Sequence, residues 1–209
     1  MPPNSKSRYR LCVEGKDDQW SIIGLLARHG FDWEDAAADS PYVHDCGGVD
    51  KLLDAGVIAA SLKTYRRLGW VLDADLEPLS RWAQIRDALA KNGLSVPGAP
   101  PADGLVIPGL SSDSRVGVWL MPDNSAPGCL EDFLGKLVPG GDACWTHAGS
   151  STEHARTIGA PLAHKDLSKG AVHAWLAWRE TPGMPFGTAW SCSSIPRSSR
   201  LSRTPSSRA

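Results

Sequence analysis

YRLCVEGKDDQW, residues Tyr9–Trp20, predicts a strand that ends in an acid and leads into a helix. Its residues 11–13 are apolar, which is typical of a short buried strand. Glu14 and Gly15 end that strand, and an amphipathic helix is expected to begin near Asp18. The sequence therefore predicts a carboxylate at the carboxyl end of a strand.

Residues 69–72 repeat this pattern of a strand followed by acids. They predict another buried strand, which ends in Asp73, Ala74 and Asp75 before the next helix. The carboxyl ends of the strands form the ligand-binding edge of an open α/β sheet, so Glu14, Asp73 and Asp75 are expected to converge there. Carboxylates repel one another unless a cation neutralises them, and hard oxygen ligands suit Mg²⁺ or Mn²⁺. We therefore predict a divalent-metal site.

Composition describes an ordinary soluble domain, with 209 residues of which 42% are hydrophobic and 22% charged. The net charge of -1 gives no global attraction to nucleic acid, so such binding needs a local basic patch or bound metal. The five cysteines form no Cys-x-x-Cys pair, which disfavours a zinc site and suits reduced thiols. No apolar run approaches ~20 residues and the start of the chain is polar, so we expect no membrane contact, no secretion and a cytoplasmic location.

The rest of the chain continues the alternation of predicted strands and helices. Strand, helix, strand, helix, strand is the pattern of a parallel sheet with right-handed crossovers. A loop rich in Pro and Gly is expected at residues 94–103. The further strands are expected at residues 42–44, 105–107 and 115–121, and the further helices at residues 49–64, 78–92, 128–134 and 166–178.

Other polar residues near strand ends have a local interpretation. His44 and Asp45 end the strand at residues 42–44, and we interpret them as turn residues, because turns select Asp for local hydrogen bonds. Glu131 and Asp132 lie in the first turn of an expected helix, where acids complement the helix dipole. A metal-binding acid after the last sheet strand would lie at the same place, so both interpretations of this pair stay open.

One lysine stands where the helix dipole disfavours it. Lys169 lies near the start of the helix expected at residues 166–178, where a cation faces the positive end of the dipole. A role facing a phosphate group and an ordinary place on the surface are given equal weight.

The chain is expected to form one domain with two irregular ends. We predict a flexible N-terminus at residues 1–8, one α/β domain at residues 9–190 and a disordered tail at residues 191–209. The tail consists largely of Ser, Arg and Pro, and no acid follows Glu180. Its abrupt change of composition is also compatible with a shifted reading frame.

The acids resemble those of the TOPRIM domain, the metal-binding catalytic module of topoisomerases, bacterial primases, small RNA-maturation nucleases and OLD-family nucleases. The matching residues are Glu14 followed by Gly15, and the Asp73 and Asp75 pair after a hydrophobic strand. From about Tyr9 to Ala189 the layout is similar to that of small stand-alone TOPRIM-like bacterial proteins of unknown function. The resemblance implies a three-layer, TOPRIM-like (Rossmann-like) α/β domain with a central, mainly parallel sheet.

The resemblance extends to the nuclease half of OLD-family enzymes, in which acids and a helical lysine surround a pair of metal ions. Carried over to this chain, it implies Mg²⁺ or Mn²⁺ ligands at Glu14, Asp18, Asp73, Asp75 and Glu131, with Lys169 offsetting charge. The chain contains no Walker A motif, so the ATPase half of an OLD enzyme is missing from it. Neighbouring residues compete for three of these places: Asp17 with Asp18, Asp132 with Glu131, and Lys165 with Lys169.

The expected function is divalent-metal-dependent hydrolysis of phosphodiesters in nucleic acid, with DNA favoured over RNA. Glu14, Asp73, Asp75 and Lys169 are the expected catalytic residues. Two alternatives stay open. The chain is also compatible with a non-catalytic protein that binds nucleic acid or a nucleotide, and with a regulatory partner of a separate ATPase. A homo-oligomer fits any of these functions.

Overall fold

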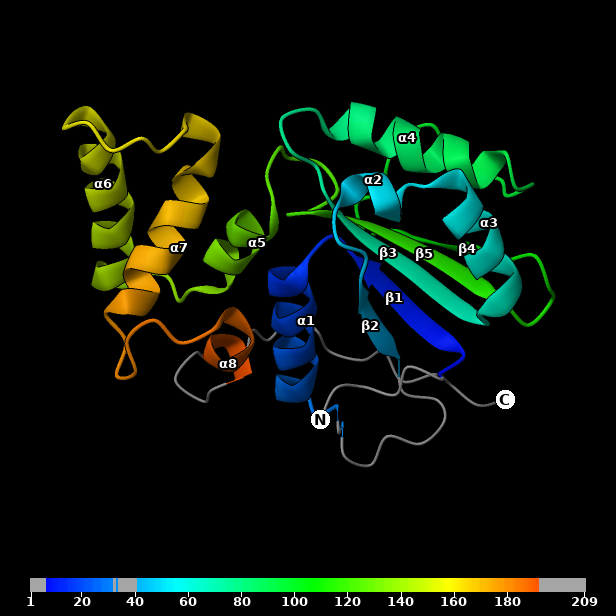
Figure 1. Cartoon of the computed structure of the whole chain (residues 1–209), viewed down its shortest axis with the longest axis horizontal. Helices are drawn as coiled ribbons and strands as arrows, with labels where there is room; N and C mark the ends of the chain where they lie inside the picture. Colours follow the sequence, from blue (N-terminus) through cyan, green and yellow to red (C-terminus); the bar gives the residue numbers. More distant parts are fainter. Residues whose placement is uncertain (1–6, 32, 34–40, 192–209) are drawn as a thin grey trace.

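The centre of the molecule is a five-stranded sheet with strand order β2-β1-β3-β5-β4 (Figure 1). The structure is a computed structural model, and it describes residues 7–31, 33 and 41–191. Strands β2, β1, β3 and β5 are parallel, and β4 runs antiparallel to β5, so the predicted α/β class with a mainly parallel sheet is confirmed. The strands are β1 (Tyr9–Val13), β2 (Tyr42–Asp45), β3 (Arg67–Asp73), β4 (Leu105–Pro108) and β5 (Arg115–Met121).

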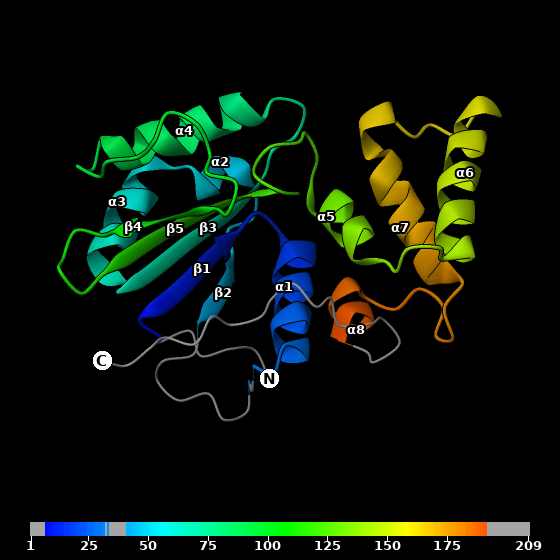
Figure 2. The same cartoon turned by 180° about the vertical axis from the view of Figure 1, so that it is seen from behind.

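Helices pack on both faces of this Rossmann-like sheet (Figures 1 and 2). Strands β2 and β3 lie on opposite sides of β1, so right-handed crossovers place the helix after β1 on one face and the helices after β2 on the other. The helix after β3 shares the second of these faces. These helices are α1 (Lys16–Arg28), α2 (Val49–Leu52), α3 (Ala55–Thr64) and α4 (Pro78–Ala90).

Strand β3 is apolar on both sides because both faces of the sheet are covered. Trp70 and Leu72 belong to the core under α2, α3 and α4, where they join Trp82 of α4. Val71 points to the opposite face and belongs to a second core with residues of α1 and of the C-terminal helices. A continuous apolar run is typical of a parallel strand covered on both faces. It explains why the strand was predictable from residues 69–72.

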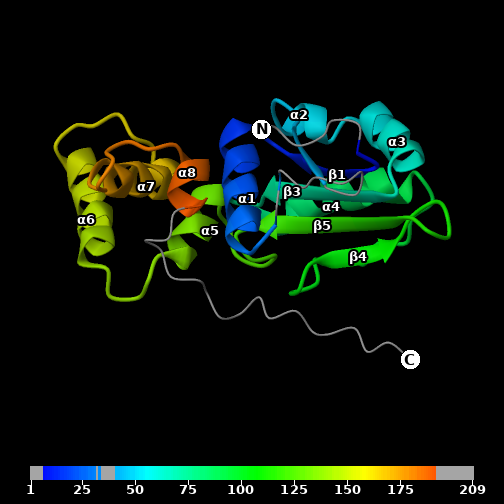
Figure 3. The ribbon, with the colours of Figure 1, turned by 90° about the horizontal axis from the view of Figure 1, so that it is seen from below.

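The C-terminal helices form a group beyond the end of the sheet (Figure 3). Two of them, α6 and α8, were not predicted. Helix α6 has no regular apolar stripe, and the residues that it buries are the small Ala148 and Thr152. The group consists of α5 (Leu130–Leu137), α6 (Ala143–Thr157), the short 3-10 helix η1 (His164–Asp166), α7 (Leu167–Ala177) and α8 (Phe186–Ser191).

Helix α8 packs tightly against α1 through two glycines. A Cβ atom added at Gly24 would lie 2.2 Å from the carbonyl oxygen of Gly187. A Cβ atom added at Gly187 would lie 2.6 Å from the carbonyl oxygen of Trp20. Since real Cβ atoms do not approach backbone so closely, the contact requires glycine at both positions.

Several predicted limits need correction. The helix expected at residues 49–64 is two helices, because Asp54 Oδ1 accepts a hydrogen bond of 2.9 Å from Val57 N and so caps a new helix, α3. Helix α1 begins at Lys16, earlier than expected, and Ser191 belongs to α8 rather than to the tail. The remaining tail and residues 1–6 lie outside the described residues. None of the helices in the described ranges is long and apolar enough to cross a bilayer.

Candidate functional site

The candidate site lies at the carboxyl ends of β1 and β3, where the order of the strands reverses. Glu14 directly follows β1, and Asp73 is the last residue of β3. The Oε1 atom of Glu14 accepts a hydrogen bond of 2.9 Å from the backbone N–H of Asp73. Strands β1 and β3 are parallel neighbours, so their pairing brings these acids together at the place where open α/β sheets bind ligands.

Local hydrogen bonds hold the acids on this edge. Asp73 Oδ1 accepts a hydrogen bond of 2.9 Å from Leu130 N, which ties the start of α5 to β3. Asp18 is buried in the first turn of α1, where its Oδ2 atom accepts a hydrogen bond of 3.0 Å from Gly15 N. The other oxygens of Glu14 and Asp73, Oε2 and Oδ2, have no hydrogen-bond donor in the described part of the chain. They are the atoms that a ligand would meet.

Burial and mutual repulsion change the protonation of this cluster. Burial, followed by repulsion from Asp18, Glu14 and other acids, raises the pKa of Asp73 to about 8. Burial also raises the pKa of Asp18 to about 6, although the hydrogen bond from Gly15 lowers it. The pKa of Glu14 is raised by burial, against the lowering effect of its bond to Asp73. Without a cation, the cluster therefore holds protons near neutral pH.

A further acid of the site, Glu131, comes from helix α5. Its side chain is 5% exposed, and its Oε1 atom lies 3.5 Å from Lys169 Nζ of α7. The Sγ atom of Cys129 donates to Glu131 Oε2 at 3.1 Å. The pKa of Lys169 is raised, chiefly by the charge of Glu131. Asp132 instead accepts a hydrogen bond of 2.9 Å from Cys129 N and caps the helix, although it also lines the cleft.

Asp75 is held by an arginine that was not predicted. It adopts the left-handed backbone conformation, with a φ of 52°, and its exposed carboxylate forms an ion pair with Arg81. Arg81 Nε also donates to the backbone carbonyl oxygen of Asp73 at 3.1 Å. Arg81 lies in the first turn of the helix that follows the Asp-x-Asp sequence. A basic residue in the first turn of the helix after Asp75 is the sequence signal that would have identified Arg81.

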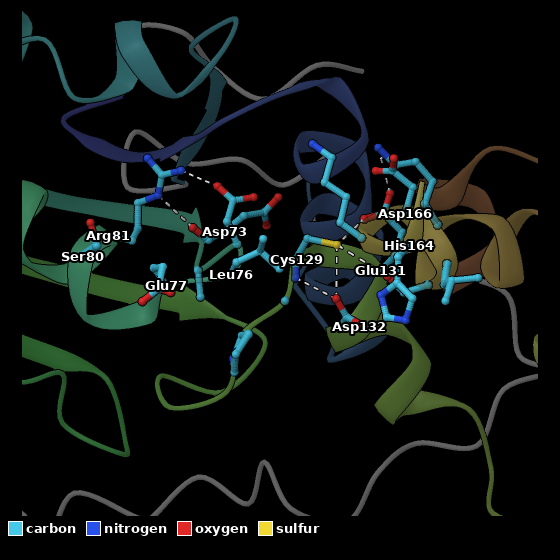
Figure 4. Close-up of a pocket in the computed structure, with 18 of the residues that line it drawn as sticks. Asp73, Leu76, Glu77, Ser80, Arg81, Cys129, Glu131, Asp132, His164 and Asp166 are labelled. Carbon is cyan, nitrogen blue, oxygen red and sulfur yellow. Dashed lines mark hydrogen bonds and ion pairs between the residues drawn. The ribbon is translucent and has the colours of Figure 1, made fainter. Parts of the chain in front are cut away.

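A cleft of about 770 Å³ lies between β3–α4 and the α5–α7 region, next to this cluster, and Asp73 lines it whereas Glu14 and Asp18 do not (Figure 4). One wall carries Asp73, Asp75 and Arg81. The opposite wall belongs to α5, η1 and α7. It carries Cys129, Glu131, Asp132, His164, Lys165, Asp166, Ser168 and Lys169.

The structure brings the predicted site residues together at the carboxyl edge of the sheet, facing the C-terminal helices. Asp73 interacts electrostatically with Asp18, Glu14, Glu131 and Asp75, and Lys169 pairs with Glu131. Between the competing neighbours, Asp17 is exposed, whereas Asp18 is buried beside the other acids. Lys165 and Lys169 both line the cleft.

One observation favours a metal ion at this site, and another disfavours it. Its donors are carboxylate oxygens, which suit Mg²⁺ or Mn²⁺, and their repulsion is the kind that a cation relieves. In the ranges that the structure describes, however, no group of three or more His, Cys, Asp or Glu residues is placed to hold a metal ion. The carboxylates are gathered but partly engaged by the protein itself, so the metal roles stay predictions.

Asp45 is a turn residue, as interpreted from the sequence. Its Oδ1 atom accepts a hydrogen bond of 2.8 Å from Gly47 N, and its Oδ2 atom lies 3.1 Å from Lys16 Nζ. Asp123, which follows β5, behaves in the same way, because its Oδ1 atom accepts hydrogen bonds from Ser125 N at 3.1 Å and Ala126 N at 2.8 Å. Both acids therefore stabilise loops next to the sheet.

The fold and the site define an α/β protein with a Rossmann-like sheet and an acid-lined cleft at the point where strand order reverses. Residues 8–203 match the model of the family described as "Protein of unknown function (DUF3226)", and the chain belongs to this family. The match includes much of the Ser- and Arg-rich tail. Comparisons with curated proteins and with solved structures find no match.

Proposed function

We propose that this chain is a divalent-metal-dependent nuclease with a three-layer domain of the TOPRIM type, which hydrolyses phosphodiester bonds in nucleic acid, DNA in preference to RNA. One observation carries the proposal. The carboxylate of Glu14 contacts the backbone of Asp73 at the carboxyl edge of the sheet, where burial and the neighbouring acids raise the pKa of Asp73 to about 8. Such an arrangement is unfavourable for folding and favourable for binding cations.

The residues expected to hold Mg²⁺ or Mn²⁺ are Glu14, Asp18, Asp73, Asp75 and Glu131. A bound pair of these ions supplies activation of water and neutralisation of charge on a phosphodiester. Glu14 Oε2 and Asp73 Oδ2 are the ready donors, because the other oxygen of each already accepts a backbone hydrogen bond. Asp75 becomes available when its ion pair with Arg81 opens, and its side chain is 61% exposed.

The cations of the cleft have different parts in this proposal. Lys169 lies half-exposed beside the buried carboxylate of Glu131, so its ammonium is held at the wall of the cleft. From there it stabilises negative charge that develops on a phosphate during cleavage. Arg81 bonds to the backbone of Asp73 and to the side chain of Asp75, which orients the loop that carries both acids.

The experiment that tests the proposal is incubation of the purified protein with circular DNA, linear DNA and RNA. Mg²⁺ or Mn²⁺ is added to one series and EDTA to the other. We expect cleavage with metal and none with EDTA. Absence of cleavage of every substrate with either metal, by protein whose melting temperature shows it is folded, rejects the nuclease.

One observation favours a second candidate, a protein that binds nucleic acid or a nucleotide without cleaving it. Within the described residues, no group of three potential ligands is assembled to hold a metal. Lys165, Lys169 and Arg81 nevertheless line the cleft with cationic side chains. Binding of an oligonucleotide without cleavage, unchanged by Glu14→Gln, would support this candidate over the nuclease.

A further inference from the structure

An exposed leucine stands at the cleft. Leu76 directly follows the Asp73 to Asp75 sequence and lines the cleft on the wall of Arg81 (Figure 4), yet its side chain is 68% exposed. Leu79 is exposed to the same extent, 67%, but does not line the cleft. Leu76 therefore places an apolar surface beside charged groups, where it gains nothing from burial in the free protein.

The opposite wall offers a cation that the protein does not neutralise. Arg81 is paired with Asp75, and Lys169 with Glu131. Lys165 lies exposed on η1 and lines the same cleft, and no ion pair of its ammonium is found in the part of the chain that the structure describes. It is thus the cation of the cleft that is ready to meet an anion from outside.

We propose that the cleft holds a single nucleic-acid strand, with a base or sugar of one nucleotide against Leu76 and a phosphate of the strand on Lys165. The substrate class is then single-stranded nucleic acid or an unpaired end, not an intact duplex. This inference rests on the proposed function and narrows its substrate.

The chemistry of a duplex fits these two contacts poorly. An intact duplex keeps its bases stacked inside, so an apolar side chain reaches them only after unstacking, which costs a few kcal/mol per step in general. A single strand exposes its bases, and proteins bind such strands by combining cationic contacts to the backbone with contacts to the bases.

The size of the cleft points the same way. A cleft of about 770 Å³ lies within the range of small-ligand sites, about 300–1,000 Å³, which accommodates a short piece of one strand. With a net charge of -1, the chain has no overall positive field to collect nucleic acid of either form. Recognition therefore depends on the few groups inside the cleft.

The test compares cleavage of a single-stranded oligonucleotide with cleavage of the duplex of the same sequence, in Mn²⁺. We expect kcat/KM for the single strand to be higher by about tenfold or more. Leu76→Ser and Lys165→Ala should each raise KM for the single strand by about five- to tenfold, with kcat nearly unchanged, because both residues bind substrate away from the acids.

Matched controls come from the same chain. Leu79→Ser removes an equally exposed leucine outside the cleft, and Lys91→Ala removes an exposed lysine at the far end of α4. Both controls should keep the KM of the parent. Equal cleavage of duplex and single strand, or equal effects of Leu76→Ser and Leu79→Ser, overturns the inference and leaves the nuclease intact.

A binding measurement separates the two proposals if the parent cleaves nothing. Fluorescence anisotropy with the same labelled oligonucleotides then decides. Preferential binding of the single strand, weakened by Leu76→Ser and Lys165→Ala but not by the controls, supports the strand site while the nuclease fails. Absence of binding to either oligonucleotide rejects both.

Discussion

The two sides of the candidate site hold their acids in different ways. On the sheet side, Glu14 and Asp73 are placed by the pairing of β1 with β3, and each carboxylate accepts one backbone N–H. On the helical side, Glu131 is placed by the packing of α5 against α7 and is matched by Lys169 and by the thiol of Cys129. Within the described residues, Glu14 and Asp73 thus have no ion pair, whereas Glu131 is paired with Lys169.

The two sides share one local hydrogen bond but differ in the charges around it. Helices α1 and α5 begin with the same device, in which Asp18 and Asp132 each accept the N–H of the residue that precedes their helix. The pKa of Asp18 is nevertheless raised to about 6, because it is buried among other acids. The same capping hydrogen bond therefore occurs in two different surroundings, and Asp18 is the one that lies among the carboxylates of the proposed metal site.

The largest expected effect is the loss of cleavage when an acid on the sheet side is replaced. Glu14→Gln or Asp73→Asn should lower the rate in Mg²⁺ by about 10³-fold or more, because each removes a carboxylate donor of the proposed metal site. Initial rates on a labelled oligonucleotide measure this. Asp17→Asn, which changes an exposed acid next to the cluster, serves as the control and should keep the parent rate. A fully active Glu14→Gln variant would remove the metal-site hypothesis.

On the helical side, Lys169→Ala should lower turnover by about 10²-fold, because Lys169 offsets charge on the phosphate rather than holding the ion. The Mg²⁺ concentration that gives half the maximal rate should stay nearly constant. Titration of the metal in a single-turnover assay separates these quantities. If the variant instead needs much more Mg²⁺ while its turnover is unchanged, the role of Lys169 is to hold Glu131 in place.

The sheet wall should also make stability depend on pH. The pKa of Asp73 is raised to about 8 in the folded protein, from about 3.9 in the unfolded chain, so the metal-free folded state binds the extra proton. The contribution of Asp73 to stability is therefore fully present below about pH 4, and it is lost as the pH rises from there through about 8. We expect a loss of the order of 2 kcal/mol, or about 4–8 °C in Tm, between pH 5 and pH 8.5 in EDTA.

Thermal melts of the parent and of Asp73→Asn measure this effect. The variant should lose less stability over the same pH range, and Mg²⁺ should raise the Tm of the parent more than that of the variant. An identical response of both proteins to pH and to Mg²⁺ would show that Asp73 does not carry the repulsion.

The smallest expected effect concerns the thiol on the helical wall. Cys129→Ala removes the donor to Glu131 and should lower the free energy of unfolding by about 1 kcal/mol. Cys129→Ser keeps a donor and should recover part of the loss. Urea unfolding measures both variants, with Cys144→Ala, at an exposed cysteine, as the control. Equal stability of the alanine and serine variants would mean that the hydrogen bond contributes nothing.

The sequence was sufficient for the sheet and for the acids attached to it. Apolar strands that end in Glu14 and Asp73 have a fixed direction in a parallel sheet, so their ends meet at one edge whatever the loops do. Local patterns also identified Asp45 as a turn residue. These features depend on interactions between neighbours in sequence or on strand pairing.

The helical wall was less predictable because it depends on packing between helices. Helix α6 buries small residues, which leave no apolar period in the sequence. Whether Lys169 or Lys165 pairs with Glu131 follows from the packing of α5 against α7 and η1, not from spacing. Arg81 and Cys129 act through contacts to acids that become neighbours only after folding.

The glycine contact between α1 and α8 has a consequence for the synthesis of the chain. Gly24 leaves the ribosome early, and its partner Gly187 emerges only after nearly all of the described chain has been made. Until then the apolar side of α1, including Ile22, lacks the helix that covers part of it. Among the described helices, the first thus waits for the last, and this long-range closure leaves part of the apolar side of α1 uncovered while the chain is being made.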